Sequence, residues 1–221
     1  MSGERIPWRW PMLGCGLLCL AGFIALPLEI GWRNQEIWSS LPGDLEKSIQ
    51  LSEFFAHGFG VLVIVVGLLI LFPQIRRKLP RVIGCIVAAG LAANLLKLIA
   101  GRRRPISLNE ETVEKISDSW AGWFVAFQGQ FDYMYQAFPS GHTATAVGLA
   151  VGLSWLQPRG AYFFFSLAAL AGLQRIVSQA HWPSDVAFGA AIGLLCASCL
   201  VCSRRLDGLF ARWEPSESDR L

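Results

Sequence analysis

The chain has 221 residues, of which 53% are hydrophobic and only 16% are charged, whereas soluble domains carry about 25% charged residues. This balance argues against a soluble protein, a disordered chain and a secreted disulfide scaffold, and the net charge of +3 is too small to indicate a nucleic-acid partner. Because a membrane span needs about 20 apolar residues, the length suits one multi-span membrane domain over residues 1–221.

Six apolar runs predict six transmembrane helices, so the expected fold class is all-α, an integral membrane bundle. The first run follows Arg5 and Arg9 and lacks a small-residue cleavage site, which favours a retained anchor over a cleaved signal peptide. The six cysteines lie in or beside these runs, and we interpret them as small packing residues rather than metal ligands. The expected spans cover residues 12–30, 54–72, 82–100, 141–156, 161–177 and 186–202.

The segment between the third and fourth spans, residues 107–138, is too long for a simple turn. Its aromatic residues recur at steps of three and four from Trp120 to Phe131. This spacing predicts an amphipathic helix that lies in the headgroup layer. The alternative is a soluble flap whose aromatic residues form a small core of their own.

The distribution of basic residues predicts the orientation, because cytoplasmic loops are enriched in Lys and Arg. Eleven basic residues fall on one face: Arg5, Arg9, Arg76, Arg77, Lys78, Arg81, Arg159, Arg204, Arg205, Arg212 and Arg220. The opposite face holds Arg33, Lys47 and Lys115, together with a cluster at span ends: Lys97, Arg102, Arg103, Arg104 and Arg175. The protein is therefore expected in a bacterial inner membrane, with both termini on its cytoplasmic side and the cluster of basic residues on its extracytoplasmic side.

Three short segments on that outer face carry groups suited to chemistry. The residues are Lys97 and Arg104, then Ser140, Gly141 and His142, then Arg175, His181 and Asp185. Ionisable groups near spans are costly unless they have a function or a partner. Three cations and the free N–H groups at a helix start would suit a phosphoryl group. We interpret Arg102 and Arg103 as residues that only reach toward headgroups, and His57 as a structural or interfacial histidine. Ser140 alone would be a helix N-cap.

These segments resemble the signature of the type 2 phosphatidic acid phosphatases, relatives of the vanadium haloperoxidases. Lys97 and Arg104-Pro105 fit the first part, and Pro139-Ser140-Gly141-His142 fits the second. Arg175, His181 and Asp185 fit the third, but Gln174 stands where the family usually has serine. The resemblance runs from the third span to the sixth.

The resemblance implies a role for each residue. His181 would attack phosphorus and form a phosphohistidine, Asp185 would hold the other imidazole nitrogen, and His142 would protonate the leaving oxygen and then activate water. The phosphate oxygens would be held by Lys97, Arg104, Ser140, Gly141 and Arg175. The pairs Gly148/Gly152 and Gly189/Gly193 would let the fourth and sixth spans pack closely.

The expected function is therefore a lipid phosphatase that needs no metal and no cofactor. Its expected substrate is a polyprenyl diphosphate, phosphatidylglycerol phosphate or phosphatidic acid, and its other partners are membrane lipids, with no nucleic acid. One alternative is a lipid phosphotransferase or lipid A phosphatase of the same family. The other is a non-catalytic lipid-binding or transport protein, which would need the cations but no oriented nucleophile.

Overall fold

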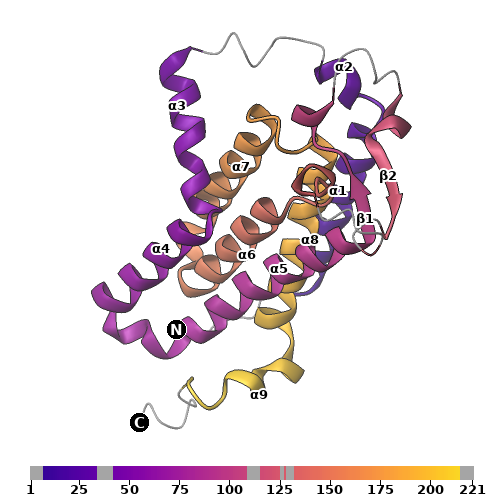
Figure 1. Ribbon diagram of the computed structural model, residues 1–221. Coiled ribbons are helices and arrows are strands. Elements are labelled where there is room, and N and C mark those ends of the chain that lie inside the picture. Colours follow the sequence, from indigo (N-terminus) through magenta and orange to yellow (C-terminus); the bar gives the residue numbers. More distant parts are fainter. Residues whose placement is uncertain (1–6, 34–41, 109–114, 125–126, 128–131, 215–221) are drawn as a thin grey trace.

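The computed structural model describes residues 7–33, 42–108, 115–124, 127 and 132–214, and this part of the chain is nearly all helical (Figure 1). The main elements in chain order are α1 (Arg9–Ala25), α2 (Glu29–Arg33), α3 (Gly43–Leu51), η2 (Ser52–Phe55), α4 (Gly58–Leu71), η3 (Pro73–Lys78), α5 (Leu79–Ile99), β1 (Ala100–Arg102), η4 (Pro105–Ser107), η6 (Ile116–Ser119), β2 (Trp120–Trp123), η8 (Tyr133–Tyr135), α6 (Gly141–Leu156), η9 (Pro158–Gly160), α7 (Ala161–Val177), α8 (Pro183–Cys202), η10 (Arg204–Leu206) and α9 (Asp207–Phe210).

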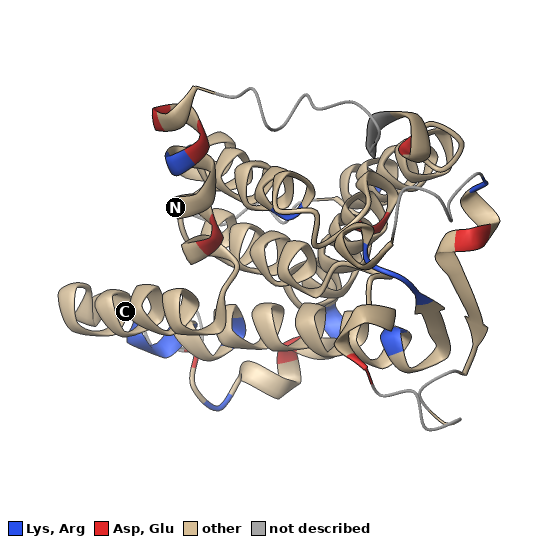
Figure 2. Cartoon of the chain, turned by 45° about the horizontal axis from the view of Figure 1, so that its top comes forward, with Lys and Arg blue, Asp and Glu red and all other residues tan. Residues whose placement is uncertain are grey.

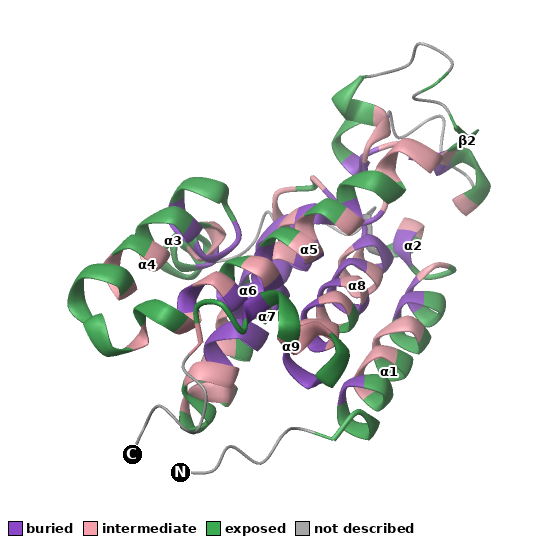
Figure 3. Cartoon of the chain, turned by 90° about the horizontal axis from the view of Figure 1, so that it is seen from below, coloured by how far each residue is buried: buried purple, intermediate pink, exposed green. Residues whose placement is uncertain are grey.

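Helix α6 forms the centre of the bundle. It packs against α5, α7 and α8, and most of its residues are buried, whereas α1 covers the outer side of α8 (Figure 3). The core of the bundle is built from small and medium apolar side chains such as Val82, Leu149 and Ala171. Since neighbouring helices in this group run in opposite directions, the end of α5, the start of α6, the end of α7 and the start of α8 share one end of the bundle.

The described helices support a membrane protein but not all six predicted spans. Three helical segments are long and apolar enough to cross a bilayer: Pro73–Ile99, Pro158–Val177 and Pro183–Cys202. A fourth is counted if Gly43–Phe55 and Gly58–Leu71, which are bent by 67°, form one span. Helices α1 and α6 have only 17 and 16 residues. At about 1.5 Å per residue such helices are shorter than a hydrocarbon core of about 30 Å.

The outer faces of the bundle are apolar, as expected for a surface in contact with lipid. Large hydrophobic side chains are exposed along α1, α4, α5 and α7, among them Phe23, Ile70, Val87 and Phe163. Soluble proteins rarely expose apolar areas of this extent. The apolar residues of the chain therefore lie on the outer surface of the bundle as well as in its core.

The amphipathic helix predicted from Trp120 to Phe131 is wrong at its start. Trp120–Trp123 forms strand β2, which pairs in antiparallel fashion with β1. Gly122 and Phe124 have φ values of 114° and 58°, in the left-handed region that interrupts a right-handed helix. Trp123, Phe124 and Phe127 are exposed, so the aromatic character of the surface is retained. Residues 125–126 and 128–131 lie outside the described part.

One of the two glycine pairs serves the predicted contact, and the other serves a different one. Gly189 and Gly193 of α8 lie against the backbone carbonyls of Ser140 and Ala144, so α8 does pack closely on α6. Gly148 and Gly152 of α6 instead face α5, where an added Cβ on Gly148 would lie 2.8 Å from the Cys85 carbonyl oxygen. The pairs therefore bring both α5 and α8 close to α6, and α6 is the shared neighbour.

Several arginine side chains lie at the end of the bundle opposite the predicted site, and one of them is buried. Arg76, Arg77, Arg204 and Arg205 are exposed, but Arg81 is only 4% exposed and binds the carboxylates of Asp207 and Glu214 at 3.0 and 2.7 Å. Arg81 therefore holds the segment after α8 against α5, in addition to any contribution of its charge to the orientation of the protein in the membrane.

Candidate active site

The shared end of α5, α6, α7 and α8 brings all eight predicted site residues into one region. The strand that follows α5 carries basic residues into this region, shown in blue in Figure 2. The site residues are Lys97 at the end of α5, Arg104 after β1, Ser140, Gly141 and His142 at the start of α6, Arg175 near the end of α7, His181 in the turn that follows, and Asp185 in the first turn of α8.

His181 is buried and held in one tautomer. Its Nδ1 lies 2.6 Å from the carbonyl oxygen of Ala137, and because a carbonyl oxygen only accepts, Nδ1 must carry the proton. Nδ1 is 3.8 Å from Oδ2 of Asp185, so the backbone carbonyl, and not the predicted carboxylate, is the nearest partner. Nε2 is left with a free electron pair.

The electrostatic surroundings keep this imidazole neutral. Burial lowers the pKa of His181 to about 4; the attraction of Asp185 opposes the shift, whereas Arg104 and Lys97 add to it. Above about pH 5 the ring is therefore uncharged, which is the form that a nitrogen nucleophile needs.

Asp185 is part of a fully buried ion network that the sequence analysis missed. Arg102 donates from Nη1 to Asp185 Oδ1 and from Nη2 to Glu29 Oε2, both at 2.5 Å, and neither Arg102 nor the two carboxylates is exposed. Oδ2 of Asp185 accepts the backbone N–H of Trp182 at 2.9 Å, and Oε1 of Glu29 accepts that of Ser184 at 2.6 Å. The interpretation of Arg102 as a residue that only reaches toward headgroups is wrong.

The start of α6 presents a compact polar turn. Ser140 is the N-cap of α6, and its Oγ accepts from the N–H and Oγ1 of Thr143 at 3.4 and 2.9 Å. The N–H of Ser140 donates to the Asp185 backbone carbonyl at 2.9 Å, which ties α6 to α8. At Gly141 an added Cβ would lie 3.4 Å from Nζ of Lys97, so the glycine allows the ammonium group to approach the helix start.

The guanidinium of Arg104 is fixed by the backbone. It donates to the carbonyl oxygens of Tyr133, Ala180 and Gln136 at 3.0, 3.0 and 3.3 Å and lies over the Tyr133 ring. Each of these acceptors is neutral, so the positive charge of Arg104 is not cancelled by a carboxylate in these contacts. A fixed, uncancelled cation is what preorganised stabilisation of an anion requires.

A carboxylate that the sequence analysis did not select also lies in the site. Oε1 of Glu53, from η2, is 2.8 Å from Nη2 of Arg175 and 3.8 Å from Nε2 of His142. The ring of His57 lies 6.1 Å from that of His142, and its Nδ1 caps α4 by accepting from the Phe59 N–H at 3.3 Å. The capping contact agrees with the structural role predicted for His57.

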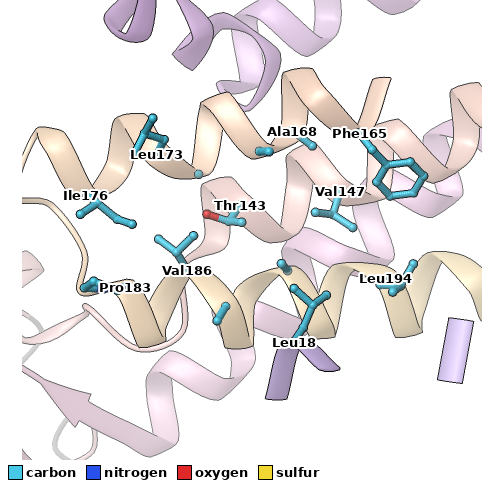
Figure 4. A pocket seen from close by; sticks show the side chains of 14 residues that line it. Leu18, Thr143, Val147, Phe165, Ala168, Leu173, Ile176, Pro183, Val186 and Leu194 are labelled. Atoms are coloured by element: carbon cyan, nitrogen blue, oxygen red, sulfur yellow. The ribbon is translucent and has the colours of Figure 1, made fainter. Parts of the chain in front are cut away.

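An apolar groove begins one helical turn from the site. It has a volume of about 410 Å³ and is lined by α1, α6, α7 and α8 (Figure 4). None of the eight site residues lines the groove, but Thr143 does, and its Oγ1 donates to Ser140 Oγ at 2.9 Å, so one end of the groove lies at the start of α6. Further along, its walls are apolar, for example Val147 and Leu194.

These features define a helical membrane protein whose site combines two histidines with three basic side chains. Residues 78–207 match the PAP2 superfamily. The chain therefore belongs to this superfamily, as the sequence motifs predicted.

Relatives in this superfamily carry names of lipid phosphatases. Over 108 residues the chain is 35% identical to a lipid A 1-phosphatase of Rhizobium etli, which covers 49% of this chain and 42% of the relative. It is 31% identical over 159 residues to a decaprenylphosphoryl-5-phosphoribose phosphatase of Mycobacterium tuberculosis, covering 69% of this chain and 76% of the relative. The crystal structure of Aquifex aeolicus LpxE superposes with a TM-score of 0.56 at 26% identity, over 78% of this chain and 93% of that one. The chain thus matches less than half of the Rhizobium protein.

Proposed function

We propose that this protein hydrolyses the phosphate of a membrane lipid through a phosphohistidine on His181. The observation that carries the proposal is the buried imidazole of His181, whose Nδ1 lies 2.6 Å from the Ala137 carbonyl oxygen. This contact fixes the orientation of the ring and leaves the electron pair on Nε2 available to attack phosphorus. A protein that only bound lipid would need the cations but not an oriented nucleophile.

In the first step Nε2 of His181 attacks phosphorus, and the bond from phosphorus to the leaving oxygen breaks. Lys97, Arg104 and Arg175 hold the phosphoryl oxygens, together with Ser140 and the N–H of Gly141, where charge accumulates in the transition state. Protonated His142 gives its proton to the leaving oxygen and becomes neutral. In the second step neutral His142 takes a proton from water, and the water oxygen forms a bond to phosphorus. The bond from phosphorus to Nε2 breaks, which releases inorganic phosphate and restores His181.

Asp185 has a supporting role in this mechanism. Its carboxylate lies 3.8 Å from Nδ1 of His181 and stabilises the positive charge that the imidazole gains during attack. The buried contact with Arg102 fixes the carboxylate in place, so Asp185 acts as a preorganised negative charge and not as a mobile base.

The groove supports a lipid as the substrate. A volume of about 410 Å³ lies within the range of small-molecule pockets, about 300–1,000 Å³. We assign its apolar walls to a hydrocarbon chain of the substrate, with the phosphate at the rim. The names of the relatives point in the same direction, toward phosphorylated glycolipids and lipid-linked sugars in addition to the three lipids predicted from the sequence.

The experiment is a panel of lipid phosphates and one water-soluble phosphate ester, incubated with the detergent-solubilised protein while phosphate release is followed. At least one lipid should be hydrolysed with a KM about tenfold or more below that of the soluble ester, because burial of a few CH₂ groups is sufficient for that difference. Because cations bind the phosphate, activity should persist in strong chelators, and vanadate should inhibit as a transition-state mimic. Loss of activity in chelator with recovery on addition of magnesium contradicts the mechanism.

The six-span frame and its orientation are part of the proposal. We infer that α1 and α6 cross the membrane as short spans within the bundle, that both termini are cytoplasmic, and that the site faces the outside. The support is the exposed basic group of Arg76, Arg77, Arg204 and Arg205 at the end opposite the site.

Single cysteine substitutions test the orientation in intact cells. Lys115→Cys should react with a membrane-impermeant thiol reagent, and Arg205→Cys should not, because only the former faces the outside. The unsubstituted protein is the control, since its own cysteines are buried or half-buried. Labelling at position 205 but not at 115 would place the site in the cytoplasm.

A further inference from the structure

Glu53 occupies a position where the proposed mechanism needs a phosphate oxygen. A single carboxylate oxygen, Oε1, lies between Nη2 of Arg175 at 2.8 Å and Nε2 of His142 at 3.8 Å. Arg175 is a phosphate-holding cation of the proposed site, and His142 is its proton donor. An oxygen between these two groups therefore imitates a substrate oxygen.

Both donors on one edge of Arg175 are already bound within the protein. Nε donates to Oε1 of Gln174 at 2.5 Å, and Nη2 is taken by Glu53. This edge of a guanidinium is well suited to hold two oxygens of one phosphate group. A phosphate that binds Arg175 through both donors of this edge must therefore displace the Gln174 amide oxygen and the Glu53 carboxylate, of which only Glu53 is charged.

Gln174 holds the segment that carries Glu53. Its Nε2 donates to Oε1 of Gln50 at 2.8 Å and to Oε2 of Glu53 at 3.4 Å, and α3 and η2 pack against α7 (Figure 1). The side chain of Gln174 is 1% exposed, so these contacts are built into the packing. A serine at position 174 would be too short to bind both Arg175 and the α3–η2 segment.

We propose that Glu53 is a displaceable counter-ion, which neutralises Arg175 when no phosphate is bound and competes with phosphate for the site. The inference rests on the proposed function, because it takes Arg175 and His142 as the phosphate site. Two anions cannot share one guanidinium edge without a large repulsion. The Glu53 side chain is 36% exposed, so its carboxylate can turn toward solvent. Competition of this kind lowers the affinity of the site for inorganic phosphate and so promotes release of this product.

The test is the affinity of Glu53→Gln for vanadate and inorganic phosphate, measured as inhibition constants against a water-soluble ester. This variant keeps the size of the side chain and removes its charge, so both inhibitors should bind about tenfold more tightly, an estimate reduced for the partial exposure of Glu53. Glu46→Gln makes the same charge change on an exposed part of α3 and should leave both constants unchanged.

Gln174→Ser provides a second, independent variant, because it retains the charge of Glu53 but removes the amide that holds it. Vanadate should bind about threefold more tightly to this variant. Unchanged inhibition constants in Glu53→Gln overturn the inference; if kcat falls at the same time with an altered pH profile, Glu53 is instead a partner of His142 in proton transfer. If the unsubstituted protein neither hydrolyses phosphate esters nor binds vanadate, the proposed function itself fails.

Discussion

Replacing His181 with alanine should abolish phosphate release, by about 10⁴-fold or more, and no phosphorylated protein should form. The substitution removes the atom that attacks phosphorus, and the cations that remain only bind the substrate. Because burial lowers the pKa of His181 to about 4, the wild-type ring is neutral and competent from about pH 5 upward. A pH profile of kcat/KM that shows no loss from this group above pH 5 would agree with that value.

Replacing His142 with alanine should have a different effect, because the nucleophile remains. Loss of a proton donor costs about 10²–10⁴-fold in rate with lipid phosphates, whose leaving oxygens need protonation. Nitrophenyl phosphate has a good leaving group, so with this substrate His142→Ala should form phosphohistidine and then stall, since water lacks its base. Quenching under conditions that preserve phosphoramidates makes the label measurable. Label on His181→Ala and none on His142→Ala would mean that the two roles are exchanged.

The parts of the fold that the sequence predicted well are those with local signals. The bounds predicted for the fourth and fifth helices, 141–156 and 161–177, coincide with those of α6 and α7. Ser140 caps the start of α6, and Pro158 lies between the two helices, where it cannot continue α6. The motif residues were found for the same reason, because each group lies within a few positions at the end of a helix.

Local sequence signals could not distinguish an interfacial helix from an irregular segment between the third and fourth predicted spans. Aromatic residues at steps of three and four describe one face of a helix, but they also occur in an irregular segment that meets the membrane. Pairing of Gly101 with Gly122 across β1 and β2 is a contact between distant positions, and it decides the local structure there.

The charged residues that were missed have partners far away in the sequence. Arg102 and Glu29 are 73 positions apart, and Gln174 and Glu53 are 121 apart, so no local spacing connects them. One signal was present: Glu29 is a carboxylate at the end of an apolar run. A charge in such a place needs a partner, and the basic cluster predicted on the outer face contained Arg102.

Arg102→Met should be among the most destabilising substitutions in the described part of the chain, whereas Arg103→Met should have little effect. Arg102 links Glu29 and Asp185 inside the bundle and also donates to Ser184 Oγ at 2.7 Å. Removal of one partner from a buried ion pair costs about 3–5 kcal/mol, because the remaining carboxylates stay buried without a counter-charge. Arg103 is half-buried and faces the Tyr135 ring at 5.5 Å, a contact worth about 0.5–1 kcal/mol at an exposed site.

Thermal unfolding of the two variants in the same detergent measures this difference, since they make the same chemical change at adjacent positions. Arg102→Met should melt well below Arg103→Met, by about 6–20 °C if each kcal/mol lowers Tm by about 2–4 °C. At temperatures where Arg102→Met is still folded, its turnover should fall too, because Asp185 loses the contact that fixes it beside His181. Arg102→Lys keeps the charge but lacks the planar fork that reaches both carboxylates, so it should fall between the two. Equal melting temperatures for Arg102→Met and Arg103→Met would mean that the buried ion network does not stabilise the bundle.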